Sequence, residues 1–340
     1  MATTVEDTGK LPSKTQMETL NATLQSINTN LATKFATKDD VTTNTNDIAT
    51  NKANIKTNTE DIATLGTNVA TNTSDIATNK SNIETNTHDI TVLTKSKLDI
   101  FNNAGFHNAN PRCKNLGTSI SDAQHTAIQN QTYDDLFIGD YWTLPFNDNG
   151  TSKNIIFRIW GCGWYLNYGD TPLTKGNLLI MPDPNIWQGA VMNSTNTTDG
   201  AIIGSAMYKN TIPAINTALA TTFGSSHLLT HRMLLPNAVS NGIASNWSWY
   251  DTQAMLPTEE EIYGTREWSQ AVQNGFDGNI SYNQFPLARF MPQFICNRAD
   301  WWLRSVYSAS YFCLVSADGN CSNTGASGSV LGVRPCFLID

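Results

Sequence analysis

Aromatic residues are almost missing from the first hundred positions of this 340-residue chain, which hold no Trp, no Tyr and a single Phe, Phe35. All nine Trp and all ten Tyr lie beyond that point. Aromatic side chains bury more apolar surface than most others, so their absence excludes a globular core from the first part, and their abundance permits one in the second. The composition therefore predicts two unlike regions that meet near residue 100.

Long apolar runs and clusters of positive charge are also lacking. No run approaches the roughly 20 residues that a membrane-spanning helix needs. The start of the chain, MATTVEDTGKLP, has no basic segment followed by an apolar one. The formal net charge is -8, which would repel phosphate backbones. We expect no membrane insertion, no cleaved signal and no nucleic-acid partner.

Recognisable metal-binding and catalytic motifs are missing as well. The cysteines form no CxxC or CxxH pattern, and no HExxH, GxSxG or P-loop occurs. A helix could place His227 and His231 on one face as metal ligands, but a structural role is favoured. The sequence therefore predicts no metal and no cofactor.

The six cysteines are expected to be buried as small hydrophobic side chains. They are Cys113, Cys162, Cys296, Cys313, Cys321 and Cys336. A bridge from Cys313 to either Cys321 or Cys336 stays open for a protein that works outside a cell, because spacing alone does not assign pairs.

A strict seven-residue repeat fills residues 41 to 93. β-Branched residues recur at one core position of the heptad, and mostly Asn stands three places later, which predicts a coiled coil. The expected core residues are Ile48, Asn51, Ile55, Asn58, Ile62, Asn72, Ile76, Asn79, Ile83, Asn86 and Ile90. A repeat of fourteen residues, DIATNKANIKTNTE and two variants of it, lies over the heptads and indicates growth by duplication.

The alternative for this segment is a disordered linker, since Thr and Asn are poor helix formers and Gly66 interrupts the run. A period of 3.5 serves no purpose in a linker, however, and Asp47 with Lys52 falls where parallel helices bring opposite charges together. Asn in place of Leu at the second core position disfavours a dimer. The alternation resembles the stalks of trimeric bacterial adhesins and phage fibres, where rings of Asn can hold an anion, and this resemblance implies a homotrimer.

The expected organisation has four parts. Residues 1–16 are predicted to be an attachment peptide or a frayed end. The stalk is expected over residues 17–98, with a break near residues 35–40 where the heptad phase changes. A connector over residues 99–130 then leads to the head over residues 131–340.

Beyond the stalk, short apolar runs alternate with Gly, Asn, Asp and Pro, which is typical of strands joined by long loops. A helix is expected over residues 205–224, with Ser205 as its N-cap and Pro213 in its first turns. Thr258 and Glu261 have the spacing of a capping box and predict another helix. The head is therefore expected to be α+β.

Two late motifs indicate scaffold. In WWLRS, Trp301 and Trp302 would be buried on opposite faces of a strand, and Arg304 would pair with a buried carboxylate or with main-chain carbonyls. In GVRPCFLID, apolar side chains enter the core while Pro335 limits the strand to an edge or to its start.

Together with FIGDYW and MLPTEEEIYG, these motifs resemble the head domains of tail-fibre and adhesin proteins of phages and prophages, over roughly residues 130–340. The resemblance implies a C-type-lectin-like fold, related to formylglycine-generating enzymes. The expected fold class is thus an α+β head of C-type-lectin-like fold preceded by a long parallel trimeric α-helical coiled coil.

Residues 306–330 are dense in Ser, Asn, Tyr and Gly, a composition that suits recognition. In the resembled fold this stretch lies on the ligand-binding face, and in some relatives a retroelement diversifies it. The alternative is a pair of hairpins with ADGN as a turn. The expected receptor contacts are Tyr307, Ser308, Ser310, Tyr311, Phe312, Asn320, Ser322, Asn323 and Thr324. Trp247 and Trp249 are a second candidate, for which a core position competes with a ligand platform.

The expected function is attachment without catalysis. The protein would be a phage tail-fibre or receptor-binding protein that binds a bacterial surface protein or glycan through three heads, and would join the phage tail or baseplate through its N-terminus. It would belong to the virion, be assembled in the host cytoplasm and act outside the cell. A bacterial surface adhesin is the first alternative, and a polysaccharide-degrading fibre enzyme the second, although Glu259 and Glu260 are adjacent rather than facing.

Overall fold

The computed structural model describes most of the chain and divides it into two units. The described residues are 11–35, 37–101, 103–269, 284–328 and 331–340. One unit comprises Met1–Ile90 and the other Thr91–Asp340. The attachment peptide expected at residues 1–16 therefore lies largely outside the described residues.

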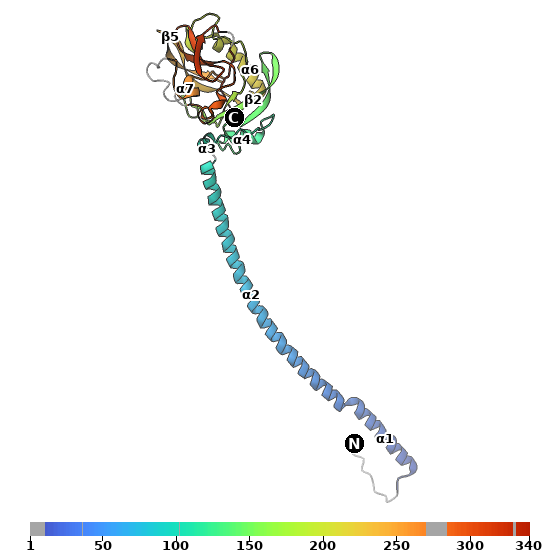
Figure 1. Cartoon of the computed structure of the whole chain (residues 1–340). Helices are drawn as coiled ribbons and strands as arrows, with labels where there is room; N and C mark the ends of the chain where they lie inside the picture. Colours follow the sequence, from blue (N-terminus) through green and yellow to red (C-terminus); the bar gives the residue numbers. More distant parts are fainter. Residues whose placement is uncertain (1–10, 36, 102, 270–283, 329–330) are drawn as a thin grey trace. The chain divides into compact units, whose positions relative to one another are not determined.

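The first unit is helical (Figure 1). Helix α1 spans Lys14–Lys34 and begins with a capping box between Ser13 and Gln16. Phe35 has extended backbone angles and ends this helix, and helix α2 then runs over Lys38–Phe101. The interruption coincides with the change of heptad phase in the sequence.

All described side chains of α1 and α2 are exposed. Their hydroxyl groups are satisfied locally, as where Thr59 donates to the carbonyl of Ile55 at 2.8 Å. Their aliphatic groups are not covered, since Ile62 exposes 69% of its surface. We call the exposed row on α2 the isoleucine stripe, which consists of Ile48, Ile55, Ile62, Ile76, Ile83 and Ile90.

The predicted fold class is wrong. In place of a coiled-coil stalk, the described chain has one long helix that runs without a helical partner. The head, with its antiparallel sheets and short helices, is compatible with the expected α+β class. A coiled coil buries its core positions between helices, whereas Ile55 exposes 66% of its surface here. The heptads specify which face of α2 is apolar, and a single chain does not cover that face.

Within its described residues, the head contains three antiparallel sheets. The largest has the strand order β1-β2-β3-β10-β4, and its strands are β1 (Tyr141–Asp148), β2 (Thr151–Cys162), β3 (Leu178–Pro182), β10 (Phe337–Ile339) and β4 (Leu228–Leu229). A hairpin forms the second sheet, from β5 (His231–Ser240) and β6 (Ile243–Thr252). The third sheet, in the order β7-β8-β9, consists of β7 (Trp301–Val306), β8 (Tyr311–Val315) and β9 (Cys321–Gly325).

Short helices connect the strands of the head. They are α3 (Ala104–Ala109), α4 (Asp122–Gln129), α5 (Ala201–Gly204), the π-helix η1 (Met207–Thr211), α6 (Ile212–Phe223), α7 (Glu259–Tyr263), α8 (Pro286–Phe290) and the 3₁₀-helix η3 (Pro292–Phe294). None of the described helices is both long and apolar enough to cross a membrane.

The core of the head is aromatic. Phe157 on β2 packs against Phe146 at 5.5 Å between ring centroids, against Phe223 at 5.0 Å and against Phe337 at 6.0 Å. These rings join β1, β2, α6 and β10, and Figure 1 shows α6 beside this sheet. Edge-to-face packing of this kind adds to the free energy of burial.

Buried charges link the late motifs. The guanidinium of Arg304 donates to both oxygens of Glu261, at 2.8 and 3.0 Å, and to the carbonyl of Leu256 at 2.5 Å. The prediction that Arg304 pairs with a buried carboxylate is thus confirmed. Arg334 is buried too, and its acceptors among the described residues are main-chain carbonyls, such as that of Pro182 at 3.0 Å.

Two local predictions for helices are also confirmed. The hydroxyl of Ser205 accepts a hydrogen bond from the N–H of Tyr208 at 3.1 Å, at the start of η1. Pro213 lies in the first turn of α6, where the missing N–H of proline costs the helix no hydrogen bond. Thr258 and Glu261 form the expected capping box of α7.

Candidate functional site

Exposed large apolar side chains are few in the head. Beyond residue 103, and among the described residues, they are Trp268 (42% exposed), Phe290 (48%) and Tyr311 (41%). Such side chains lie at binding sites more often than single small ones do. They mark two places, an aromatic surface beside the third sheet and the rim of a pocket.

The aromatic surface consists of Trp268, Tyr307 and Tyr311. Trp268 meets Tyr307 edge to face, with 5.6 Å between ring centroids and 86° between planes. The ring centroids of Tyr307 and Tyr311 lie 6.5 Å apart. The half-buried ring of Tyr307 therefore contacts both of the exposed rings.

A tight turn between two buried strands holds the two tyrosines. The N–H of Tyr307 donates to the carbonyl of Tyr311 at 3.0 Å, and the N–H of Ser308 donates to the same carbonyl at 3.2 Å. Strand β8 continues from Tyr311 with four buried residues, Phe312, Cys313, Leu314 and Val315. The rings thus stand on a backbone that the core fixes.

A buried carboxylate holds the tryptophan. Glu259 is fully buried, and its oxygens accept the N–H of Trp268 at 2.8 Å, the N–H of Ser269 at 2.9 Å and the thiol of Cys321 at 3.0 Å. The indole N–H of Trp268 donates to the carbonyl of Cys321 at 3.1 Å. Trp268 is therefore anchored at its backbone to Glu259 of α7 and at its ring to the edge strand β9.

These contacts also set the ionisation of the groups around Glu259. Burial acts to raise the pKa of the Glu259 carboxyl, but hydrogen bonds from Cys321, Ser269 and Trp268 outweigh it and lower this pKa. Burial, with the neighbouring Glu259, raises the pKa of the Cys321 and Cys313 thiols. Both thiols are thus protonated at neutral pH and are not activated nucleophiles.

The three adjacent glutamates of MLPTEEEIYG have three different partners. Glu259 holds Trp268, Glu260 forms an ion pair with Arg266, and Glu261 pairs with Arg304. All three are buried. Because each carboxylate is committed to its own contact, the group is a framework for the surface above it.

The expected receptor contacts occupy different depths. Tyr311 and Asn320 are exposed. The half-buried ones are Tyr307, Ser308, Ser310, Ser322, Asn323, Thr324, Trp247 and Trp249. Phe312 has no exposed surface, which leaves nothing for a ligand to touch. We correct its assignment to the core, because in β8 it points to the opposite face from Tyr311.

The two tryptophans of SNWSWY lie on β6, in the second sheet. Trp249 packs against Tyr168, with 5.2 Å between ring centroids. The indole N–H of Trp247 is enclosed and has no hydrogen-bond partner among the described residues. No ring contact between described residues links either Trp to the aromatic surface, so the structure does not bring the two candidate sites together.

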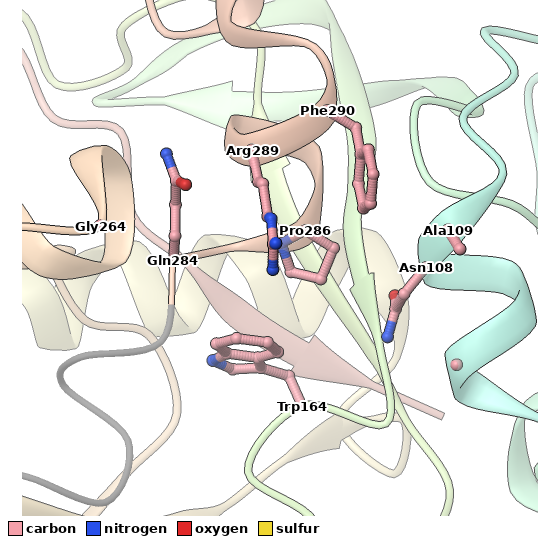
Figure 2. A pocket seen from close by; sticks show the side chains of 9 residues that line it. Asn108, Ala109, Trp164, Gly264, Gln284, Pro286, Arg289 and Phe290 are labelled. Carbon is pink, nitrogen blue, oxygen red and sulfur yellow. The ribbon is translucent and has the colours of Figure 1, made fainter.

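A pocket of about 510 Å³ is the second place marked by an exposed aromatic ring. Figure 2 shows Arg289 and Trp164 facing across it, with Gln284 on one flank and Phe290 on the other. The indole N–H of Trp164 has no hydrogen-bond partner, and Arg289 forms no ion pair, within the described part of the chain. The pocket could take a ring-shaped group with acceptor atoms.

Sequence reasoning missed Trp268 and Glu259 as parts of the site. Trp268 stands in a polar stretch without strand or helix signals, and Glu259 is recognisable from the sequence only as one of the adjacent carboxylates that glycan cleavage would need to face each other. Trp268 meets Tyr307 through a ring contact, and Glu259 joins the surface through its hydrogen bond to Trp268. The expected ADGN turn, by contrast, is present between β8 and β9, where the N–H of Gly319 donates to the carbonyl of Ser316 at 2.8 Å.

A family model, described as a domain of unknown function (DUF6273), matches residues 251–340 of the chain. This is about a quarter of the sequence, and it includes α7, the third sheet, β10 and all three rings of the aromatic surface. No curated protein and no solved structure matches the chain at a significant level.

Proposed function

We propose that this chain is a receptor-binding attachment protein, of the kind by which a phage tail fibre holds a particle to a bacterial surface. The aromatic surface carries the proposal: the rings of Trp268 and Tyr311 are exposed, and the half-buried ring of Tyr307 lies in contact with both, over a buried framework. Tyr and Trp dominate the binding energy of protein interfaces because they offer large contact area with few rotamers to freeze.

Rigidity supports recognition as well. Glu259 fixes Trp268, and the turn before β8 fixes Tyr307 and Tyr311. A surface whose contact groups are already held in place loses less conformational entropy on binding. Half-buried Ser and Asn side chains of β9 then supply hydrogen-bonding groups beside the rings.

The isoleucine stripe supports the proposed partners. An apolar row along the whole of α2 is costly in water, and further copies of this chain have the matching stripe. Two further copies, as expected from the sequence, would link three heads and raise the effective concentration of each later contact. Attachment to a phage tail through the N-terminus and a place in the virion are parts of the same proposal.

The test is adsorption of the full chain to cells of candidate host bacteria. Replacement of Tyr311 by Ala should weaken adsorption at least about tenfold, because a central interface Tyr typically contributes more than 1 kcal/mol. Phe290→Ala is the matched control, since this ring is as exposed as Tyr311 but lies at the pocket. Equal adsorption by the two variants, or a loss confined to Phe290→Ala, would move the receptor site away from the aromatic surface.

A further inference from the structure

The end of strand β10 brings together three side chains that can bind a metal ion. Strands β4 and β10 are antiparallel, with Leu229 opposite Leu338 and Leu228 opposite Ile339. The next pair in this register is His227 and Asp340, and the N–H of Asp340 donates to the carbonyl of His227 at 3.2 Å. The ladder therefore fixes an imidazole beside a carboxylate.

Helix α4 adds a second imidazole to this pair. The rings of His125 and His227 are stacked, with 3.7 Å between centroids and 26° between planes. The Nδ1 atom of His125 contacts the main-chain oxygen of Asp340, and Nδ1 of His227 lies 2.8 Å from Oδ1 of Asp340. Candidate ligand atoms of the three residues lie within 4.8 Å of one another, and no other group of this kind occurs among the described residues.

The donor set suits a zinc-like divalent ion. Zn²⁺ binds imidazole nitrogen and carboxylate oxygen at about 2.0–2.2 Å, so two of its tetrahedral ligands lie roughly 3.4 Å apart. The nitrogen and oxygen of His227 and Asp340 are already near that separation. Asp340 is fully buried, while the side chain of His227 is 32% exposed, which leaves a route for an ion to enter from solvent.

Lys175 is the competitor for this carboxylate. Its ammonium pairs with Oδ2 of Asp340, the oxygen that does not face His227. The Lys175 side chain is 45% exposed, so it can turn into solvent when an ion neutralises Asp340 instead. The amide of Gln129 approaches Oδ1 at 3.5 Å, which is too long for a firm hydrogen bond.

We propose that His125, His227 and Asp340 form a binding site for a divalent transition-metal ion such as Zn²⁺, which ties α4 to the β4–β10 edge of the head. Each imidazole supplies one ring nitrogen, and Asp340 supplies one carboxylate oxygen. The site lies on the five-stranded sheet, whereas the aromatic surface belongs to the third sheet.

The expected behaviour of the full chain, first stripped of metal with a chelator, is uptake of one Zn²⁺ per chain. Calorimetric titration should give that stoichiometry, and a hundredfold excess over Kd should raise the melting temperature of the head by about 5–10 °C. Co²⁺ in place of Zn²⁺ should give the visible absorption of a four-coordinate site with nitrogen ligands.

Variants separate this site from incidental binding. His125→Gln and His227→Gln should each weaken Zn²⁺ binding by at least about tenfold, and His88→Gln, a control on the exposed face of α2, should not. Lys175→Gln should tighten binding, because it removes the competing charge. If the three residues form only a hydrogen-bonded network and no metal site, Lys175→Gln should not increase the affinity for Zn²⁺.

Three results would overturn the site. They are no uptake of Zn²⁺ by the stripped wild-type chain, uptake that both His variants retain, and weaker binding by Lys175→Gln. Near-ultraviolet circular dichroism of each variant shows whether its head is folded, and the Co²⁺ spectrum of the wild-type chain tests the ligand set without any substitution.

Discussion

Isoleucine side chains are exposed on helix α2 and buried in the head. Ile62 on the helix exposes 69% of its surface, whereas Ile159 on β2 exposes none. At about 25 cal/mol per Å² of apolar surface, the head gains stability from each such residue within its own chain, and the helix gains none. The head therefore buries its apolar side chains within its own chain, whereas α2 leaves its own exposed.

The largest effect is expected from charges placed on the isoleucine stripe. Ile62→Asp together with Ile76→Asp should remove most of the helical circular dichroism at 222 nm, because Thr- and Asn-rich helices do not persist alone. The head should be unaffected. Its near-ultraviolet signal reports it separately, since every Trp lies beyond residue 100.

Thr67→Asp with Ser81→Asp is the matched control, because it adds the same charge away from the stripe. Sedimentation of the wild-type chain should show three copies that dissociate on dilution, with helix lost in parallel. A helical monomer at every concentration would contradict the expected difference in stability between α2 and the head. Equal melting temperatures of the helix in the two double variants would contradict it as well.

A smaller effect, confined to the head, is expected for Arg304→Met. This change leaves Glu261 as a buried charge without its partner, which should lower the free energy of unfolding by about 3–5 kcal/mol. The control is the exposed pair on α2, Lys56 with Glu60 at 3.9 Å, where Lys56→Met should change stability by at most about 0.5 kcal/mol. Chemical denaturation followed by Trp fluorescence measures the free energy of unfolding of Arg304→Met. Similar changes in stability for Arg304→Met and Lys56→Met would contradict the assigned role of Glu261.

The smallest effect is expected from acid at the aromatic surface. The pKa of Glu259 is lower in the folded head than its ordinary value of 4.5, so the unfolded chain binds this proton more readily. Its contribution to stability is therefore fully present above pH 4.5 and is lost as the pH falls through the folded value.

Glu259→Gln should weaken the hydrogen bonds that position Trp268 at neutral pH and so lower the stability of the head. As the pH falls, the stability of the wild-type head should approach that of this variant. Trp fluorescence and denaturant melts across this range provide the measurement. Glu18→Gln, on exposed α1, should follow wild type throughout. Glu259→Gln melting like wild type at neutral pH would show that the carboxylate does not hold the surface.

Local features could be predicted from the sequence, and long-range ones could not. The cap at Ser205, the capping box at Thr258 and the buried role of Arg304 follow from neighbours in the chain or from the strong demand of a buried charge for a partner. The place of Trp268 depends on how the segment after α7 turns back to Glu259 and onto Cys321 of β9. The meeting of His125 with Asp340 depends on how α4 packs against the end of β10. Neither leaves a spacing in the sequence.

The fold class failed for a different reason. A heptad pattern predicts which face of a helix would be buried against neighbouring helices. It does not predict whether a single chain supplies those neighbours. For the head, the resemblance rested on short motifs, and these proved to be framework residues around buried charges such as Arg304. The aromatic surface was located in part, through Tyr307 and Tyr311, because Tyr-rich turns between buried strands point outward.

The three consecutive carboxylates of α7 constrain how this protein can change in length. One residue inserted between Thr258 and Glu259 would break the capping box with Glu261, and one inserted among the three acids would change their spacing to Arg266 and Arg304. Along α2, by contrast, an added copy of the fourteen-residue repeat spans two whole heptads, so it preserves the stripe. Lineages of this protein should therefore differ by whole repeats in the helix and by substitutions alone around α7.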